Sequence, residues 1–245
     1  METILEVKNL AKSFDEKEVH RDVSFSLARG ETLGLLGHSG TGKSVLLRSL
    51  IGLEHIDRGQ IIYRNRRIDD LTETELFPVR TKISYSFQSG ALFDSVSVFE
   101  NIAYPLFEHT KLSEAEVARK VRELLRIVNL EDAEDLMPSD LSGGMQKRVG
   151  LARSMALDPD ILLYDEPTAG LDPMNIEKVV DLINRCRERG FSGILVTHDI
   201  PVARRVCDRL VIINEGQVHF DGSVAEFNSS DDDFVKTFLL NERAV

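Results

Sequence analysis

The chain has 245 residues, a net charge of −11, and 42% hydrophobic and 29% charged residues. This length is enough for one large α/β domain and short for two separate cores. The negative charge argues against a protein that mainly grips nucleic acid, so no nucleic-acid partner is expected. No run approaches the roughly 18 apolar residues of a membrane span, and the N-terminus lacks the features of a secretion signal. The two cysteines, Cys186 and Cys207, are expected to be small buried side chains without chemistry of their own.

The first part of the chain predicts strands around a glycine-rich loop. Ile83, Tyr85 and Phe87 alternate with polar neighbours, which is the period of a half-buried strand, and this strand is expected to stop at Gln88. The earlier elements follow from apolar runs and turn residues. They are short strands and turns from residue 3, a buried strand at 33–36, a helix at 44–52 and a hairpin at 59–68.

The second part of the chain alternates helices with buried strands. Ser113 and Glu116 form a capping-box pattern that is followed by one apolar face at helical spacing. A second helix is expected to begin near Ser142. Continuous apolar runs at 161–164 and 194–196, with a helical pattern between them, have β-α-β order and predict a parallel sheet. The last expected elements are a closing hairpin and a solvated helix start, at 210–220 and 231–233.

A glycine-rich loop with the sequence GHSGTGKS follows the first buried strand. It fits the phosphate-binding pattern G-x-x-x-x-G-K-[ST] in the strand-then-helix context that this pattern needs, because glycines let backbone N–H groups turn inward around phosphate oxygens. Lys43 is expected to reach the β- and γ-phosphates, and Ser44 to offer its hydroxyl to Mg²⁺. His38 fills a variable position of the pattern and is given no specific role. The loop residues expected to hold the nucleotide are Gly37, His38, Ser39, Gly40, Thr41, Gly42, Lys43 and Ser44.

Two adjacent carboxylates follow the apolar run at 161–164. They therefore lie at the C-terminal end of a buried strand, where doubly wound sheets bind their ligands. Asp165 is expected to hold Mg²⁺. Glu166 suits the base that orients the attacking water. A solvated turn would also contain such acids, but a buried strand before them and a phosphate-binding loop elsewhere favour the catalytic interpretation.

A third motif, LSGGMQKR at residues 141–148, lies shortly before Asp165 and Glu166. With the loop at 37–44, this order resembles the ATP-binding cassette (ABC) ATPases, whose signature sequence is of the LSGGQ type. The resemblance covers essentially the whole chain and implies ATP and Mg²⁺ as cofactors. It also implies four residue roles: Phe14 stacks on adenine, Gln88 joins the Mg²⁺ shell, Asp172 marks the D-loop and His198 faces the γ-phosphate. Taken singly, Phe14 would also suit a core position and His198 a strand end, but the order of the motifs favours the functional roles.

The same resemblance implies the fold and its parts. The fold is that of a P-loop NTPase of the α/β class, with a RecA-like core, an antiparallel β subdomain and a helical subdomain that carries the signature. The chain is then a single ABC ATPase domain. Its parts are expected at 1–88 and 157–225 for the β subdomain and core, at 89–156 for the helical subdomain and at 226–245 for a tail.

The resemblance further implies a head-to-tail dimer with two ATP molecules at its interface. Each ATP is then held by the loop of one copy and by Ser142, Gly143 and Gly144 of the other. Such an arrangement joins the copies through the γ-phosphate, and hydrolysis reopens them. Met145 stands where a glutamine is more usual. This departure is expected to alter interface contacts rather than γ-phosphate binding.

The segment after Gln88 is expected to contact the membrane partner. Its sequence also indicates which group of ABC ATPases the chain resembles. It contains GALF at residues 90–93 and VFENIAYPL at 98–106, which are similar to the MlaF-type ATPases of Mla/Mce phospholipid transport systems. That resemblance implies an MlaE-like integral membrane permease, an MCE-domain protein reached through the permease, and in some systems a small STAS-domain protein. The chain would then be a peripheral protein on the cytoplasmic face of the bacterial inner membrane.

Three other interpretations of the motifs stay open. The first is a close rival to phospholipid transport, in which the chain is the ATPase of a small-solute importer or drug exporter. A soluble ABC ATPase of DNA repair or translation is expected to carry a long coiled-coil insertion, tandem cassettes or a basic surface, and this sequence shows none of these. An inactive regulatory cassette is disfavoured because the catalytic residues are intact, namely Lys43, Asp165, Glu166 and His198.

Overall fold

The computed structural model describes residues 2–87 and 90–241. The strands are β1 (Thr3–Phe14), β2 (Lys17–Ala28), β3 (Thr32–Leu36), β4 (Arg58–Tyr63), β5 (Arg66–Arg67), β6 (Ile83–Ser86), β7 (Ile161–Asp165), β8 (Ser192–Val196), β9 (Arg209–Asn214) and β10 (Gln217–Ser223). The helices are α1 (Lys43–Ser49), α2 (Glu73–Arg80), α3 (Val98–His109), α4 (Glu114–Ile127), α5 (Gly143–Met155), α6 (Pro173–Glu188), α7 (Ile200–Val206), α8 (Val224–Asn228) and α9 (Asp233–Asn241). No helix among these residues is long and apolar enough to cross a membrane.

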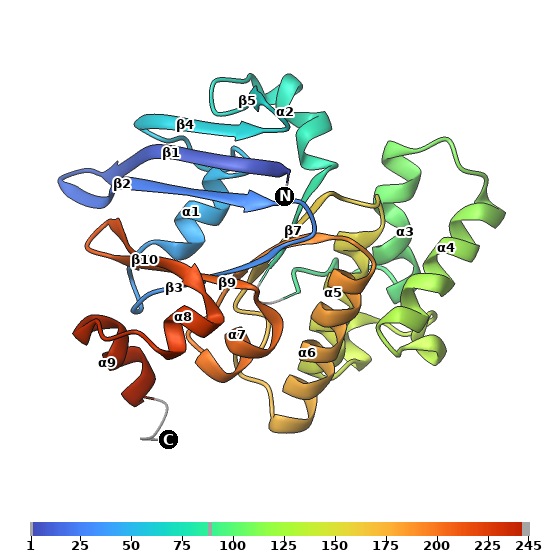
Figure 1. The fold of residues 1–245 in the computed structure, drawn as a ribbon. Coiled ribbons are helices and arrows are strands. Elements are labelled where there is room, and N and C mark those ends of the chain that lie inside the picture. The colour runs from blue at the N-terminus through green and yellow to red at the C-terminus, as the bar shows by residue number, and fades with distance from the viewer. Residues whose placement is uncertain (1, 88–89, 242–245) are drawn as a thin grey trace.

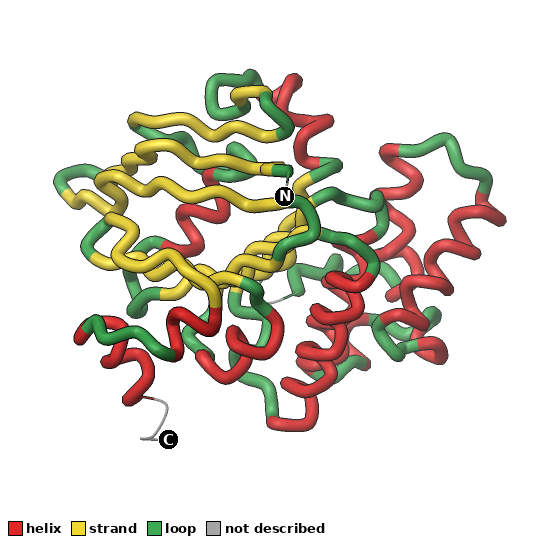
Figure 2. The backbone as a smooth tube through the Cα atoms, viewed as in Figure 1, coloured by secondary structure: helices red, strands yellow, loops and turns green. Residues whose placement is uncertain are grey.

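The strands form one mixed sheet in the order β5-β4-β1-β2-β10-β9-β3-β8-β7-β6. β1, β2, β4 and β5 pair antiparallel, whereas β9, β3, β8, β7 and β6 pair parallel. A single parallel pair, Gln217 with Asp22, joins the two halves between β10 and β2. Figure 2 shows the antiparallel half standing above the parallel strands. The α/β class, the parallel core and the antiparallel β part are confirmed.

The parallel strands are buried on both faces, which explains their unbroken apolar runs. Leu162 and Tyr164 of β7 belong to the core shared with α5, α6 and α7, and Ile161 and Leu163 belong to the core shared with α1. Figure 1 shows α1 on the side of β1 and β2, and α5, α6 and α7 on the opposite side. The carboxyl ends of β3 and β7 are thereby held between two packed layers.

The helical part consists of α3, α4 and α5, which pack on one another beside the sheet (Figure 1). The capping box of Ser113 and Glu116 begins α4, as expected, and Ser142 caps α5. The predicted apolar face of α4 is buried and consists of Val117, Val121, Leu124, Leu125 and the C-cap residue Val128. Cys186 and Cys207 are buried, as the sequence indicated.

Several boundaries differ from the expectation. β6 ends at Ser86, so the prediction that Phe87 belongs to this strand is wrong, since alternation alone does not tell where pairing with β7 stops. The first helix is Lys43–Ser49 and not 44–52. Three short helices were not anticipated, α2, α7 and α8, and the first two contain proline. The division into parts at 88, 156 and 225 stays a prediction.

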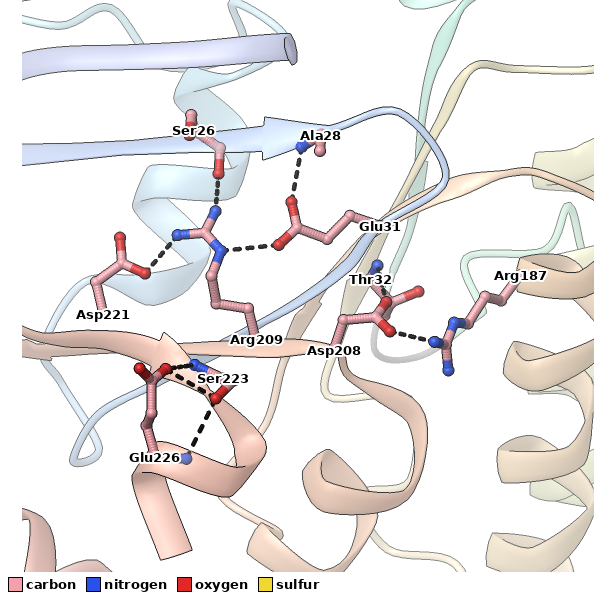
Figure 3. Close-up of polar contacts among 10 residues, drawn as sticks. All are labelled: Ser26, Ala28, Glu31, Thr32, Arg187, Asp208, Arg209, Asp221, Ser223 and Glu226. Carbon is pink, nitrogen blue, oxygen red and sulfur yellow. Dashed lines mark hydrogen bonds and ion pairs between the residues drawn. The ribbon is translucent and has the colours of Figure 1, made fainter. Parts of the chain in front are cut away.

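The side chain of Arg209 contacts both halves of the sheet (Figure 3). Arg209 on β9 donates to the carbonyl oxygen of Ser26 on β2 and pairs with Asp221 on β10. Its Nε also lies 2.8 Å from Glu31 Oε1, and the other oxygen of Glu31 accepts the backbone N–H of Ala28 at 2.7 Å. These contacts reinforce a junction where only one residue pair links the strands.

Candidate functional site

The predicted phosphate-binding loop connects β3 to α1, as the sequence indicated. Lys43 is buried, and its Nζ donates to the carbonyl oxygens of Gly37 at 2.8 Å and His38 at 3.0 Å. Burial lowers the pKa of Lys43, while the nearby charges of Glu166 and Asp165 act in the opposite direction. The ammonium group is therefore held inside the loop, next to two carboxylates.

Two loop glycines have backbone conformations that disfavour other residues. Gly40 has φ +81° with open space around it, and Gly42 has φ +86°. A Cβ on Gly42 would lie 2.3 Å from Val19 Cγ1, so no side chain fits between the loop and β2. This close approach leaves the backbone of the loop open toward the cavity.

Asp165 ends β7 and is held by two hydroxyl groups. Ser44 Oγ donates to its Oδ1 at 2.9 Å, and the Tyr85 hydroxyl donates to its Oδ2 at 2.5 Å. Burial, followed by the hydrogen bond to Asp165, raises the pKa of Tyr85, so this hydroxyl keeps its proton. A carboxylate and a hydroxyl 2.9 Å apart match the oxygen ligands and small ligand number that Mg²⁺ takes from proteins. The residues present therefore fit the predicted ion.

Glu166 and His198 lie next to each other at the ends of β7 and β8. The Glu166 N–H donates to Val196 O at 2.9 Å, and Glu166 Oε2 lies 3.0 Å from His198 Nδ1. Glu166 has φ +49°, a left-handed conformation that is uncommon for a non-glycine residue and often occurs at functional sites. Its side chain is 16% exposed and that of His198 is 72% exposed. A nearly buried carboxylate thus faces a solvent-accessible imidazole.

Lys43, Ser44, Glu166 and His198 line one cavity of about 570 Å³. Phe14 lies at its edge with 41% of its surface exposed, and Lys12 Nζ lies 4.8 Å from the centre of its ring. An exposed aromatic ring beside a phosphate-binding loop offers a stacking surface for a base. The cavity is lined by Phe14, Lys17, Val19, Ser39, Gly40, Gly42, Lys43, Ser44, Val45, Glu166, Val196 and His198.

The remaining predicted site residues do not line this cavity. Ser142 is exposed at the start of α5, where its Oγ accepts the Met145 N–H at 3.3 Å. Asp172 is exposed at the start of α6, where it accepts the Asn175 N–H at 3.0 Å. Gly143 is exposed, and a Cβ on it would meet nothing within 4 Å. The signature segment is thus exposed at Ser142 and Gly143, whereas Gly144, which was also predicted to contact ATP, is buried against Asn175.

Two other residues predicted to bind the nucleotide or its Mg²⁺ are Gln88 and His38. Gln88 lies outside the described residues. His38 packs its ring against Phe238 of α9 at 5.0 Å and does not line the cavity. Sequence patterns did not reveal the roles of Tyr85 and Val19, because their contacts with Asp165 and with the loop depend on strand pairing.

Comparison with known proteins decides the family. A family model described as ABC transporter matches residues 20–169. The chain belongs to the ABC transporter family. As a member of this family it is an ATPase subunit that binds ATP with Mg²⁺. Its predicted family membership, fold class and cofactors are confirmed.

Individual ABC proteins resemble this chain over nearly its full length. It is 41% identical to the "probable ribonucleotide transport ATP-binding protein mkl" of Mycobacterium leprae, over 99% of this chain and 70% of that protein. It is 36% identical to the "intermembrane phospholipid transport system ATP-binding protein MlaF" of Haemophilus influenzae, over 98% of this chain and 92% of that protein. A solved dimeric structure of the ATP-binding cassette MJ0796 with ADP and Pi has a TM-score of 0.83 at 31% identity, covering 90% of this chain and 99% of that one.

Proposed function

We propose that this chain is the ATP-hydrolysing subunit of a transporter that moves phospholipid between the inner membrane and the cell envelope. The proposed ATPase activity is supported by the cavity that Lys43, Glu166 and His198 line together. The phospholipid part is supported by the identity with MlaF over 92% of that protein's length and by the segment after residue 89. The chain would act as a peripheral subunit on the cytoplasmic face of that membrane.

The polar and aromatic residues at the cavity have distinct roles in this mechanism. Lys43 and the loop N–H groups bind the β- and γ-phosphates, and Phe14 stacks on the adenine. Ser44 and Asp165 would hold Mg²⁺, which when bound neutralises phosphate charge. Glu166 takes a proton from the attacking water, and His198, 3.0 Å away, orients this carboxylate and faces the γ-phosphate. Positioning and charge compensation are the main contributions that phosphoryl transfer requires from a protein.

We further propose that a second copy of the chain completes the site. Ser142, Gly143 and Asp172 are exposed and lie outside the cavity of their own chain, which is the placement expected of residues that contact a partner. The similar MJ0796 cassette is itself a dimer bound to ADP and Pi. In a head-to-tail dimer, the start of α5 of one copy would cover the γ-phosphate held by the loop of the other.

A groove of about 550 Å³ is the surface proposed to receive the permease. Phe77, Phe93 and Tyr104 line it with 55%, 47% and 50% of their surfaces exposed, and exposed aromatic clusters mark protein interfaces. Arg153 of α5 donates to the carbonyl oxygen of Ala91 at 2.7 Å and lies 5.2 Å from the Phe93 ring. A short helix from a cytoplasmic loop of an MlaE-like permease would fit this groove, and the MCE-domain protein would be reached through the permease.

The GALF segment connects this groove to α5. A Cβ on Gly90 would lie 2.9 Å from Gln146 O, and a Cβ on Gly150 would lie 2.7 Å from Gly90 O. The loop and the helix therefore touch backbone to backbone, at positions where only glycine fits. A shift of the permease in the groove would move α5, whose first turn carries the signature residues.

The alternative is the ATPase of a small-solute importer or exporter. The identity of 41% with a relative named as a ribonucleotide transport protein favours this interpretation as much as MlaF favours lipid. The cargo is decided by the partner and not by the ATPase fold.

Affinity purification from native membranes, followed by mass spectrometry of proteins and lipids, tests the proposal. It predicts co-purification of an MlaE-like permease, an MCE-domain protein and phospholipid, with a STAS-domain protein as a further component in some systems. A tagged chain in which Phe93→Asp and Tyr104→Asp disrupt the groove is the matched control and should lose the permease. Recovery of a solute permease without an MCE-domain protein would contradict the lipid assignment and leave the ATPase assignment intact.

A further inference from the structure

A buried histidine that the proposed mechanism does not use lies directly behind the phosphate-binding loop. His20 of β2 is 0% exposed, and its Nε2 lies 3.1 Å from the carbonyl oxygen of Gly42. This carbonyl also accepts the Leu46 N–H at 2.9 Å, in the first turn of α1. His20 therefore contacts the residue that immediately precedes Lys43.

The surroundings of His20 determine its tautomer. A carbonyl oxygen can only accept a hydrogen bond, so Nε2 carries the hydrogen in this contact. Nδ1 is buried and has no hydrogen-bond partner among the described residues. Burial lowers the pKa of His20, although the bond to Gly42 acts in the opposite direction. The ring is thus neutral at pH 7 and serves as a donor to the loop.

The bond to Gly42 orients a peptide unit of the loop. In a trans peptide the C=O and N–H groups point in opposite directions, so fixing the Gly42 carbonyl toward His20 directs the Lys43 N–H away from the His20 ring. The first N–H groups of a helix have no partner within the helix and remain available to a ligand. A Cβ on Gly42 would lie 2.9 Å from the His20 ring, so only glycine fits at this position beside His20.

We propose that His20 is a positioning residue, whose Nε2–H sets the orientation of the Gly42–Lys43 peptide so that the Lys43 N–H is aligned for nucleotide phosphate before ATP arrives. The inference rests on the proposed nucleotide site and extends it to the antiparallel strands. Phe14 and Lys17, which line the other end of the cavity, lie on β1 and β2, the same pair of strands. The contact of His20 would therefore fix the position of the phosphate-binding loop relative to the strands that carry Phe14 and Lys17.

The test compares two substitutions of His20 by isothermal titration with MgATP. His20→Leu fills the buried position with an apolar side chain and removes the donor, and His20→Gln keeps an N–H at nearly the same position. His20→Leu should weaken MgATP binding about 3- to 10-fold, which is the range for one neutral hydrogen bond, and His20→Gln should bind within about twofold of the native chain. His20→Met replaces the leucine variant if the latter does not fold.

The outcomes separate this inference from the proposed function. Equal affinity of the native chain and the leucine or methionine variant would overturn the positioning role, and so would equal weakening in the glutamine variant. Unfolding midpoints measured on the same samples show whether a change in affinity follows the hydrogen bond or general stability. Failure of the native chain to bind MgATP, or undiminished binding by Lys43→Ala, would instead contradict the proposed nucleotide site.

Discussion

The substitution Glu166→Gln should abolish most ATP turnover and leave ATP binding intact. Glutamine has nearly the same shape, tolerates the φ of +49° as well as glutamate does, and can stay beside His198, whose Nδ1 lies 3.0 Å from the Glu166 carboxylate. It cannot accept a proton from water at neutral pH. Because it also removes a negative charge from a cavity that receives phosphates, ATP affinity should not fall.

The size of the effect follows from the role of a positioned base. Such a group contributes about 10²- to 10⁴-fold to rate, which corresponds to about 3–5 kcal/mol of activation free energy. Glu166 is 16% exposed, so bulk water does not readily replace it. Turnover should therefore fall at least about 100-fold. With hydrolysis blocked, ATP should hold two copies together.

Phosphate release and gel filtration, each with MgATP, measure the two consequences. The matched control is Glu188→Gln, an exposed glutamate near the end of α6, which should behave like the native chain. Undiminished phosphate release from Glu166→Gln, with monomer as the only species in the presence of ATP, would refute the role assigned to this carboxylate.

Three further outcomes are expected. Lys43→Ala should weaken MgATP binding at least about tenfold in a titration, because charge-assisted hydrogen bonds are worth about 1.5–3 kcal/mol. Arg209→Met should lower the free energy of unfolding in urea by about 2–3 kcal/mol, since it leaves the Glu31 carboxylate without a cation, whereas Arg205→Met at an exposed ion pair should change it far less. Burial lowers the pKa of His20 in the folded chain, so just below pH 6.5 this histidine is protonated only in the unfolded chain. The free energy of unfolding of the native chain, compared with that of His20→Gln, should therefore fall from pH 7 to pH 5.

Local patterns predicted the parts of the fold that depend on local rules. The buried strands were recognisable because both of their faces are covered, which makes β7 and β8 continuous apolar runs. The capping box at Ser113 and Glu116 was recognisable because both of its bonds form within four residues. Strand ends were less accurate, since Phe87 continues the alternation of β6 but lies beyond the last residue paired with β7.

The site was predictable where its residues belong to contiguous motifs. The loop at 37–44 and the pair Asp165–Glu166 follow two parallel strands of one sheet, β3 and β7, and the sheet brings them together. Tyr85 and His20 could not be found in this way. Their contacts, with Asp165 and with Gly42, cross 80 and 22 residues of sequence. The first depends on the pairing of β6 with β7, and the second on the position of β2 beside the loop.

The central claim is that two copies of the chain share each ATP site, and mixing two inactive variants tests it most directly. Lys43→Ala disables the loop, and Ser142→Arg should disable the exposed signature segment. Each variant alone should hydrolyse almost no ATP. An equal mixture forms hybrid dimers with one intact site, so turnover should recover to about a quarter of the native value if copies pair at random and sites act independently. Native turnover by Ser142→Arg alone, or no recovery in a mixture shown to form hybrids, would contradict the shared site.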